Sequence, residues 1–171
     1  MATKATRAVG KDPEALRQAA AEIITAFNAT APREEKRRNA LLGQLLGTWN
    51  GAVVRPPFTV TMGANIHFEE ACFVNEGCAI LDACDVRIGS FTQLAPRVRI
   101  LTETGPGTAD PAAAPKRGPV KLGRNVWVGA GAEIHPGVTV GDDVIISAGA
   151  VVREDVPAGA TYTGGAVRPP G

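Results

Sequence analysis

The chain has 171 residues and a nearly balanced charge, with 18 Lys and Arg against 17 Asp and Glu. This balance gives no argument for a nucleic acid or an anionic membrane surface as partner, so we expect neither. No apolar run is long enough to span a bilayer, and the first residues do not resemble a signal peptide. We therefore expect a cytoplasmic protein.

Residues 1–50 predict a helical segment. Asp12 followed by Pro13 is typical of a helix start, with the Asp as N-cap and the Pro at the first helical position. Apolar residues then recur at helical spacing, and a second helix is expected over Lys36–Leu46, closed by Gly47. Because helices of this length are marginal alone, we expect them to cap the open end of the domain that follows.

A six-residue period dominates residues 51–171. Apolar residues recur every six places in one block, continue after a slip of two residues, and resume after one insert (Met62, Phe68, Val74, Ile80; Ile88, Leu94, Ile100; Leu122, Val128, Ile134, Val140, Ile146, Val152). Neither a helix nor an alternating strand has this period, whereas a parallel β-helix of hexapeptide repeats does. The predicted fold class is therefore an all-β solenoid with one extruded loop at about 101–121.

The cysteines follow the same period. Cys72, Cys78 and Cys84 are spaced six apart, at the small fifth place of three repeats. A metal site would need closer pairs or histidine partners, and the histidines, His67 and His135, belong to distant coils. We expect buried structural thiols, no disulfide and no metal.

Four stretches together resemble a known family: "FNATAPREEKRRNALLGQLLG", "VVRPPFTVTMGANIHFEEACFVNEGCAILDAC", "VRIGSFTQLAP" and "VKLGRNVWVGAGAEIHPGVTVGDDVIISAGAVVREDVP". Over about residues 12–165 the chain resembles the maltose and galactoside O-acetyltransferases and the nodulation acetyltransferases. The resemblance implies a left-handed β-helix and a homotrimer with active sites between subunits. It also implies transfer of an acetyl group from acetyl-CoA, or another acyl-CoA, to a hydroxyl of a small molecule without a metal.

The same resemblance assigns roles to particular residues. Asn75 and Asp82 match acceptor-site positions, and Trp127 matches an aromatic residue that shapes the cleft near the acyl group. Ala130 and Ala148 match places where backbone amides meet the pantetheine arm of CoA. Each residue also has a purely structural interpretation, since turn Asn residues bond their own backbone and tight turns favour alanine.

Two parts of the family pattern are changed in this chain. The family's insert carries a His-Pro pair whose His removes the proton of the attacking hydroxyl, and Gly105 stands in the place of that His, in the expected substrate-binding loop. At the CoA end, Gly165 and Arg168 retain part of a Gly-Asn-Pro-Ala tail. A Thr-Lys pair that faces the CoA phosphates becomes Arg153 and Glu154, which keeps one positive charge.

Because the insert lacks the family's His, the residue that accepts the proton is not identified by the resemblance. A positioned acceptor accelerates such a step by about a hundredfold to ten-thousandfold, and Gly105 cannot supply one. Glu103, in the same loop, is the first candidate, and His67, in an early coil, is the second. We expect His135 to lie well along the solenoid axis from the insert.

Three hypotheses follow. The first is an acyl-CoA-dependent O-acyltransferase acting on a small hydroxylated molecule, with Glu103 or a substrate group as base. The second is an enzyme that keeps the cleft but catalyses a CoA-independent isomerisation, elimination or cyclisation, using Glu103, Asp82, His67 or Asn75. The third is a binding protein without turnover. The fold does not choose among them, because function belongs to the site.

Overall fold

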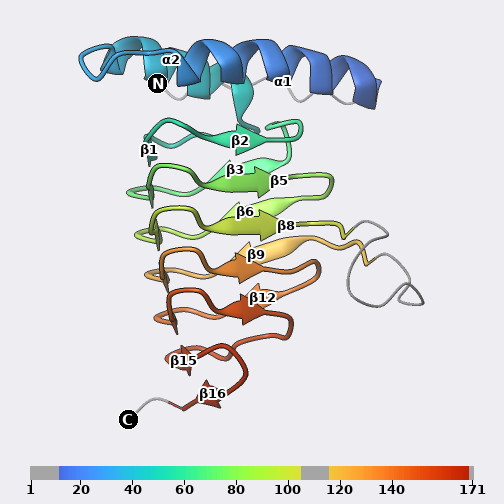
Figure 1. Cartoon of the computed structure of the whole chain (residues 1–171), viewed down its shortest axis with the longest axis vertical. Helices are drawn as coiled ribbons and strands as arrows, with labels where there is room; N and C mark the ends of the chain where they lie inside the picture. Colours follow the sequence, from blue (N-terminus) through green and yellow to red (C-terminus); the bar gives the residue numbers. More distant parts are fainter. Residues whose placement is uncertain (1–11, 105–115, 170–171) are drawn as a thin grey trace.

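Two helices lie across one end of a solenoid of short strands (Figure 1). The computed structural model describes residues 12–104 and 116–169, so Gly105 falls outside the described residues. The helices are α1 (Pro13–Asn28) and α2 (Glu35–Leu45). The strands are β1 (Val53–Val54), β2 (Thr59–Val60), β3 (Ile66–Phe68), β4 (Phe73–Val74), β5 (Ala79–Leu81), β6 (Val86–Ile88), β7 (Gln93–Leu94), β8 (Arg99–Leu101), β9 (Val120–Leu122), β10 (Trp127–Val128), β11 (Glu133–Ile134), β12 (Thr139–Val140), β13 (Ile145–Ile146), β14 (Val151–Val152), β15 (Thr161–Tyr162) and β16 (Val167–Arg168).

The strands form three sheets that the chain visits in turn. We call them the long sheet (β1-β4-β7-β10-β13-β15-β16), the middle sheet (β14-β11-β8-β5-β2) and the short sheet (β12-β9-β6-β3). Neighbouring strands are parallel, except for β15 and β16, which are antiparallel. The predicted parallel β-helix is therefore confirmed. The turn from the long to the middle sheet is the first corner, and the turn from the middle to the short sheet is the second corner.

Inward side chains stack in columns along the axis. In the middle sheet Ile80, Ile100, Ile134 and Val152 are aligned by the strand register, and all are 0% exposed. Each coil donates backbone N–H groups to the next, as from Arg99 to the Ala132 carbonyl at 2.9 Å. This ladder of hydrogen bonds pairs the backbone polar groups of successive coils. The aliphatic columns bury apolar surface and so stabilise the solenoid through the hydrophobic effect.

The second corner is wider than the sequence predicted. The register aligns Val60, and not Met62, with Ile80, while Phe68 aligns with Ile88. The slip of two residues inferred between Ile80 and Ile88 therefore also occurs one coil earlier, between Val60 and Phe68. The insert enlarges this same corner in the next coil, since it joins β8 to β9.

Asp82 joins the two wide corners. Its side chain is fully buried, and Oδ1 accepts the backbone N–H groups of Thr61 at 3.0 Å and Met62 at 2.9 Å. Oδ2 accepts the N–H of Asn65 at 3.2 Å. Burial raises the pKa of the Asp82 carboxyl, and the backbone N–H groups oppose this shift by stabilising the anion.

The helices dock on the first coil, as predicted. Phe27 and Leu42 belong to the same hydrophobic core as the coils. Asn28 bonds the backbone just ahead of β2, because its Nδ2 donates to the Phe58 carbonyl at 2.9 Å and its Oδ1 accepts the Phe58 N–H at 2.8 Å. Asp12 caps α1 by accepting the N–H of Glu14 at 3.2 Å.

The role predicted for Gly47 differs in the structure. α2 covers Glu35–Leu45, and the residue after it, Leu46, is extended, so the helix has no left-handed glycine cap. A Cβ at Gly47 would instead collide with the Ala64 carbonyl and the His67 ring. The close approach of the first coil, and not helix termination, therefore requires this glycine.

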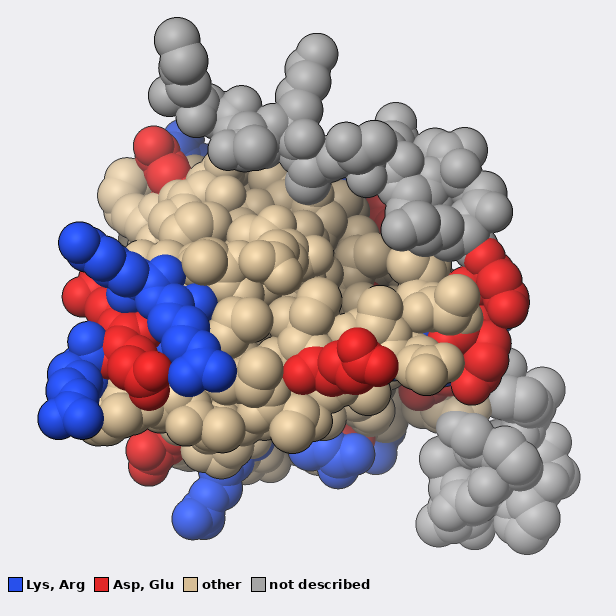
Figure 2. Space-filling model, turned by 90° about the horizontal axis from the view of Figure 1, so that it is seen from above, with Lys and Arg blue, Asp and Glu red and all other residues tan. Residues whose placement is uncertain are grey.

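The helical end carries charges of both signs. Viewed onto this end, Figure 2 shows blue and red side chains side by side on the left. Two pairs on the helices are ion pairs: Glu14 with Arg17 at 3.4 Å, and Glu34 with Arg37 at 3.1 Å. This mixed surface is typical of a solvated helix face.

Glycines occupy two different places in the turns. A Cβ at Gly129 would lie 2.8 Å from the Cα of Ala148 in the next coil, so the stacking distance excludes larger residues there. Gly131 is left-handed, with φ +68°, but has open space around its Cα. Asn125 and Asp143 adopt the same conformation at equivalent turns, with φ of 53° and 58°.

The cysteine prediction is confirmed for two thiols and wrong for the third. Cys72 and Cys78 are buried, and burial raises the pKa of Cys78 and raises that of Cys72 to about 11. Cys84 is only half-buried, because it lies among the additional residues of the wide second corner. There its sulfur accepts a hydrogen bond from Arg117 Nε at 3.3 Å.

Gly129→Ala should lower the free energy of unfolding by about 3 kcal/mol, since the new methyl group meets backbone that cannot move aside. Gly131→Asn is the matched control and should change stability by less than about 0.5 kcal/mol. Urea unfolding of both variants tests this difference. Equal losses would contradict the assignment of close stacking to Gly129.

Asp82→Ala should lower the free energy of unfolding by about 3–5 kcal/mol, because buried N–H groups lose their acceptor. Asp85, with a side chain 50% exposed, provides the control, and Asp85→Ala should cost less than about 0.5 kcal/mol. Chemical denaturation measures both. An Asp82→Ala protein with native stability would show that the carboxylate does not hold the corner.

Alkylation should distinguish the thiols. At pH 8 we expect iodoacetamide to modify Cys84 in the native protein well before Cys72 or Cys78, because a raised thiol pKa leaves little thiolate. Peptide mass spectrometry after timed labelling reports each site, and labelling in denaturant gives the full yield. Modification of Cys72 at the rate of Cys84 would contradict the burial.

Candidate active site

The residues singled out in the sequence fall on two corners of the solenoid. Asn75, Ala130 and Ala148 lie on the first corner, directly after strands of the long sheet or one residue further. Glu103 and Arg153 lie on the second corner, after strands of the middle sheet. These groups stand at opposite ends of the middle-sheet strands, so one chain does not bring them together.

The remaining candidates are also separated. Asp82 is on the second corner but is buried and occupied by backbone N–H groups. His67 lies in β3 of the short sheet, where its Nδ1 is 3.0 Å from Thr48 Oγ1 beside the cap. Gly165 lies in the hairpin between β15 and β16.

Asn75 already has one partner in its own turn. Its Oδ1 accepts the backbone N–H of Glu76 at 2.9 Å, as the structural interpretation of a turn Asn requires. Within residues 12–104 and 116–169, its Nδ2 makes no hydrogen bond. The amide therefore has donor capacity left for a ligand.

A cavity of about 620 Å³ opens beside this turn, between the cap and the first coil. Its wall includes Trp49 and Asn39 together with residues of both charges: Glu35, Arg38, Arg55 and Glu76. Trp49 is fixed by a hydrogen bond from Nε1 to the Ala52 carbonyl at 2.9 Å. The cavity therefore offers an apolar wall with donors and acceptors around it.

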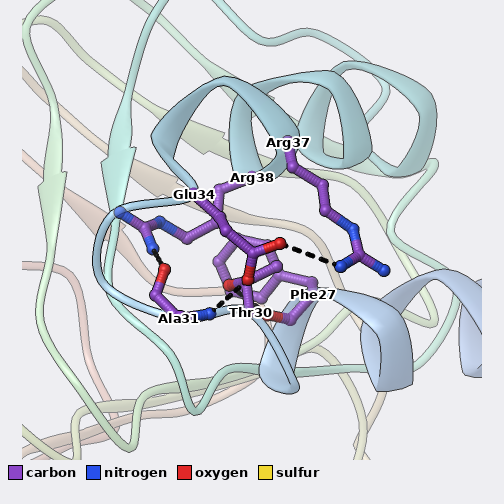
Figure 3. Close-up of polar contacts among 6 residues, drawn as sticks. All are labelled: Phe27, Thr30, Ala31, Glu34, Arg37 and Arg38. Carbon is purple, nitrogen blue, oxygen red and sulfur yellow. Dashed lines mark hydrogen bonds and ion pairs between the residues drawn. The ribbon is translucent and has the colours of Figure 1, made fainter.

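The turn between the helices contributes Thr30 and Pro32 to the wall of this cavity and is held by several polar contacts (Figure 3). Arg38 donates to the Ala31 carbonyl at 2.7 Å, and Glu34 accepts the Ala31 N–H at 2.6 Å. That N–H, and then Arg37, lower the pKa of the Glu34 carboxyl. These residues belong to a run of mixed charge, and the bonds from Glu34 and Arg38 to backbone groups of the turn are not encoded in the residue types alone.

The insert leaves and rejoins the second corner through a short stem. Thr104 N–H donates to the Lys116 carbonyl at 2.9 Å, and Gly118 N–H donates to the Thr102 carbonyl at 3.0 Å. Arg117 ties the stem to the wide corner by donating to the Ala83 carbonyl at 2.9 Å. Glu103 lies on this stem with an exposed side chain.

The structure corrects the position expected for His135. β11 pairs directly with β8, and Ile134 is aligned with Ile100, so His135 lies one coil from the base of the insert. The insert joins β8 to β9 without adding a coil. Its residues therefore lengthen the sequence between β8 and His135 but do not increase their distance along the solenoid axis. His135 Nε2 lies 2.6 Å from Glu133 Oε1, and Glu133 Oε2 lies 2.9 Å from Arg99 Nη1.

The outer face of the long sheet carries several exposed apolar side chains. Val53, Trp127 and Ile145 are 55%, 47% and 50% exposed. The strand register places them in one row with Phe73, and the polar Gln93 lies between Phe73 and Trp127. Exposed apolar side chains gathered in this way typically contact a partner or a ligand.

Within residues 12–104 and 116–169, no helix is long and apolar enough to cross a membrane. In this part of the chain there is also no cluster of three His, Cys, Asp or Glu side chains placed to hold a metal ion.

Comparison with known families and relatives supports the expected relationship. Residues 119–154 match the bacterial transferase hexapeptide (six repeats), and residues 7–51 match the maltose acetyltransferase hexapeptide capping motif. Nodulation protein L of Rhizobium meliloti (strain 1021) is 38% identical over 78% of this chain and 80% of its own length. Galactoside O-acetyltransferase of Escherichia coli (strain K12) is 33% identical over 79% of this chain and 68% of its own length.

Solved structures agree. A maltose O-acetyltransferase from Clostridium difficile 630 superposes with a TM-score of 0.83 at 36% identity, covering 91% of this chain and 85% of that one. A galactoside acetyltransferase solved in complex with coenzyme A gives a TM-score of 0.79 at 28% identity, covering 90% and 78%. The chain therefore belongs to the hexapeptide-repeat acetyltransferases of the maltose, galactoside and nodulation type, and its solenoid is the left-handed β-helix of that family.

Proposed function

We propose that this protein transfers an acyl group from acyl-CoA to a hydroxyl of a small molecule. The observation that carries the proposal is the open row of small residues on the first corner, where Ala130 and Ala148 are exposed next to the outward-facing Trp127. Small side chains leave backbone amides accessible to a pantetheine arm and to the oxyanion that forms when a thioester is attacked. A related galactoside acetyltransferase has been solved with coenzyme A.

The CoA end of the proposed site uses the last coils. Arg153 has an exposed guanidinium on the second corner, suited to a phosphate group of CoA. Gly165 and Arg168 lie in or beside the β15–β16 hairpin, which extends the long sheet at that end. We propose that these residues contact the cofactor's phosphates or nucleotide.

The acceptor end uses the cavity beside Asn75. The cavity wall contains charged and amide side chains that can donate or accept hydrogen bonds, and it also contains Trp49. Such a wall suits a small polyhydroxylated molecule. Gly105 and the rest of the insert are proposed to complete this pocket from a neighbouring chain.

Assembly as a homotrimer would complete the site. Asn75 and Glu103 stand at opposite ends of the middle-sheet strands, so a cleft containing both needs a second copy. The apolar row with Trp127 and Ile145 offers a surface for that contact. Trimer formation and a cytoplasmic location stay predictions.

Asp82 and His67 take structural roles in this proposal. The Asp82 carboxylate is occupied by backbone N–H groups, and His67 lies against Thr48 beside the cap. A CoA-independent enzyme and a binding protein remain the competing hypotheses, and both predict no transfer of an acyl group from acyl-CoA.

Calorimetric titration with acetyl-CoA and CoA tests the proposal first. We expect saturable binding with one site per subunit and a dissociation constant in the micromolar range, about −8 kcal/mol. Ala148→Glu should abolish binding, because its carboxylate would block the corner and repel the phosphates. Glu154→Gln, which removes a negative charge near Arg153, is the matched control and should bind at least as well as the native chain.

Turnover is measured with the same protein. Small polyols and monosaccharides are tested one at a time as acceptors. At least one of them should increase the rate at which CoA is released from acetyl-CoA, and mass spectrometry should find the acetyl group on that acceptor. Absence of both binding and a thermal shift at millimolar acetyl-CoA would remove CoA from the mechanism. Binding without release would favour the binding-protein hypothesis.

A further inference from the structure

His135 is held in one orientation by a chain of hydrogen bonds through Glu133 to Arg99. Its Nε2 lies 2.6 Å from Glu133 Oε1, and the other oxygen of that carboxylate lies 2.9 Å from Arg99 Nη1. The side chains of His135 and Glu133 are 15% and 22% exposed, so the pair is largely shielded from water while still reaching the surface. Such a pair fixes an imidazole more firmly than an exposed surface contact does.

The carboxylate also fixes the tautomer of the ring. An ionised carboxylate only accepts hydrogen bonds, so Nε2 carries the proton and Nδ1 carries the lone pair when the imidazole is neutral. Within residues 12–104 and 116–169, Nδ1 has no hydrogen-bond partner. A neutral imidazole whose second nitrogen is held by a carboxylate is the arrangement of a positioned proton acceptor.

The ring lies where the insert joins the solenoid. Ile134 is aligned with Ile100, the residue before the insert begins to leave the middle sheet. The returning end of the insert packs on the same turn, since a Cβ on Gly118 would lie 3.0 Å from the Cα of Gly137. His135 therefore shares the second corner with Glu103, and the hydrogen bond with Glu133 orients its side chain.

Charged groups surround this corner on each packed element. Arg99 belongs to β8, and Glu133 belongs to β11. Arg153 follows β14 in the next coil and is the neighbour of His135, because the preceding residues Val152 and Ile134 are register partners. Glu103 and Arg117 belong to the stem of the insert. Among these groups, Glu133 is the described acceptor for His135 Nε2.

We propose that His135 Nδ1 is the proton acceptor for acyl transfer and that Glu133 is its positioning residue; this inference rests on the proposed function. The acceptor hydroxyl oxygen attacks the thioester carbonyl carbon, and its proton passes to Nδ1. Collapse of the tetrahedral intermediate forms the ester and breaks the carbon–sulfur bond. The imidazolium then returns the proton to the CoA thiolate, giving CoA and the ester with all atoms accounted for.

Kinetics provide the first test. His135→Asn and His135→Gln should lower kcat for acetyl transfer, or for acetyl-CoA hydrolysis with water as acceptor, by about a hundredfold to ten-thousandfold. Their dissociation constants for CoA should stay within about twofold of the native value, because the ring does not hold the cofactor. Arg87→Gln, which removes an exposed charge on the short sheet, is the control and should keep the native rate. Circular dichroism confirms that each variant is folded.

Nitrogen NMR of the imidazoles provides a test independent of turnover. The chain has two histidines, so the spectrum of His135→Asn assigns both rings. We expect the Nε2–H tautomer for His135, a shift of its resonances when CoA or acetyl-CoA saturates the native protein, and loss of the single tautomer in Glu133→Gln. Glu133→Gln should also lower kcat by about tenfold or more while KM changes little.

The outcomes separate the two proposals. Native CoA binding and transfer with an unchanged rate in the folded His135 variants would overturn the role of His135 and leave the acyltransferase standing. A dominant Nδ1–H tautomer would overturn it as well. Absence of CoA binding in the native protein would overturn the proposed function, and the role of His135 would fall with it.

Discussion

Backbone hydrogen bonding between successive coils is the constraint on which the rest of this structure depends. Each strand donates to the strand one coil further, which sets a fixed stacking distance along the axis. That distance forces glycine at places such as Gly129, where any side chain would enter the next coil. It also fixes which residues become neighbours, because a residue is adjacent to its register partner however long the connection between them is.

The wide second corner differs from the regular coils, because it contains residues that lie outside the inter-coil strand pairing. Additional residues need partners for their backbone groups, and the Asp82 carboxylate and Thr102 hydroxyl supply them inside the turn. The same corner carries the insert, and the Arg99–Glu133–His135 contacts join the coil that bears the insert to the next coil. Structural support and candidate chemistry are thus side by side without sharing side chains.

Most of the fold was predictable from the sequence, because the six-residue period states the strand spacing directly. The helical cap, its Asp12 start and its docking on the first coil followed from ordinary helix signals. Two errors had one physical origin: the corner width is not encoded in the period, so Met62 was assigned the place of Val60, and Cys84 was expected to be buried.

The candidate site was less accessible to sequence reasoning. The resemblance to the family singled out Asn75, Ala130 and Ala148, but the cavity beside Asn75 depends on backbone contacts of the helix turn. Chain distance places His135 far from the insert, whereas the strand register places it one coil from the base of the insert. The signal available was the alternation of Glu133 and His135, which puts both side chains on one side of the strand.

The closed ends of the solenoid have a consequence for how copies of the protein associate. A stack of parallel strands terminates in unpaired backbone groups that invite another copy to continue it into a fibre. Here Asn28 occupies the backbone of Phe58 at one end, and β16 reverses direction to cover β15 at the other. At these two places the chain itself occupies backbone groups that another copy would need in order to continue the stack of parallel strands.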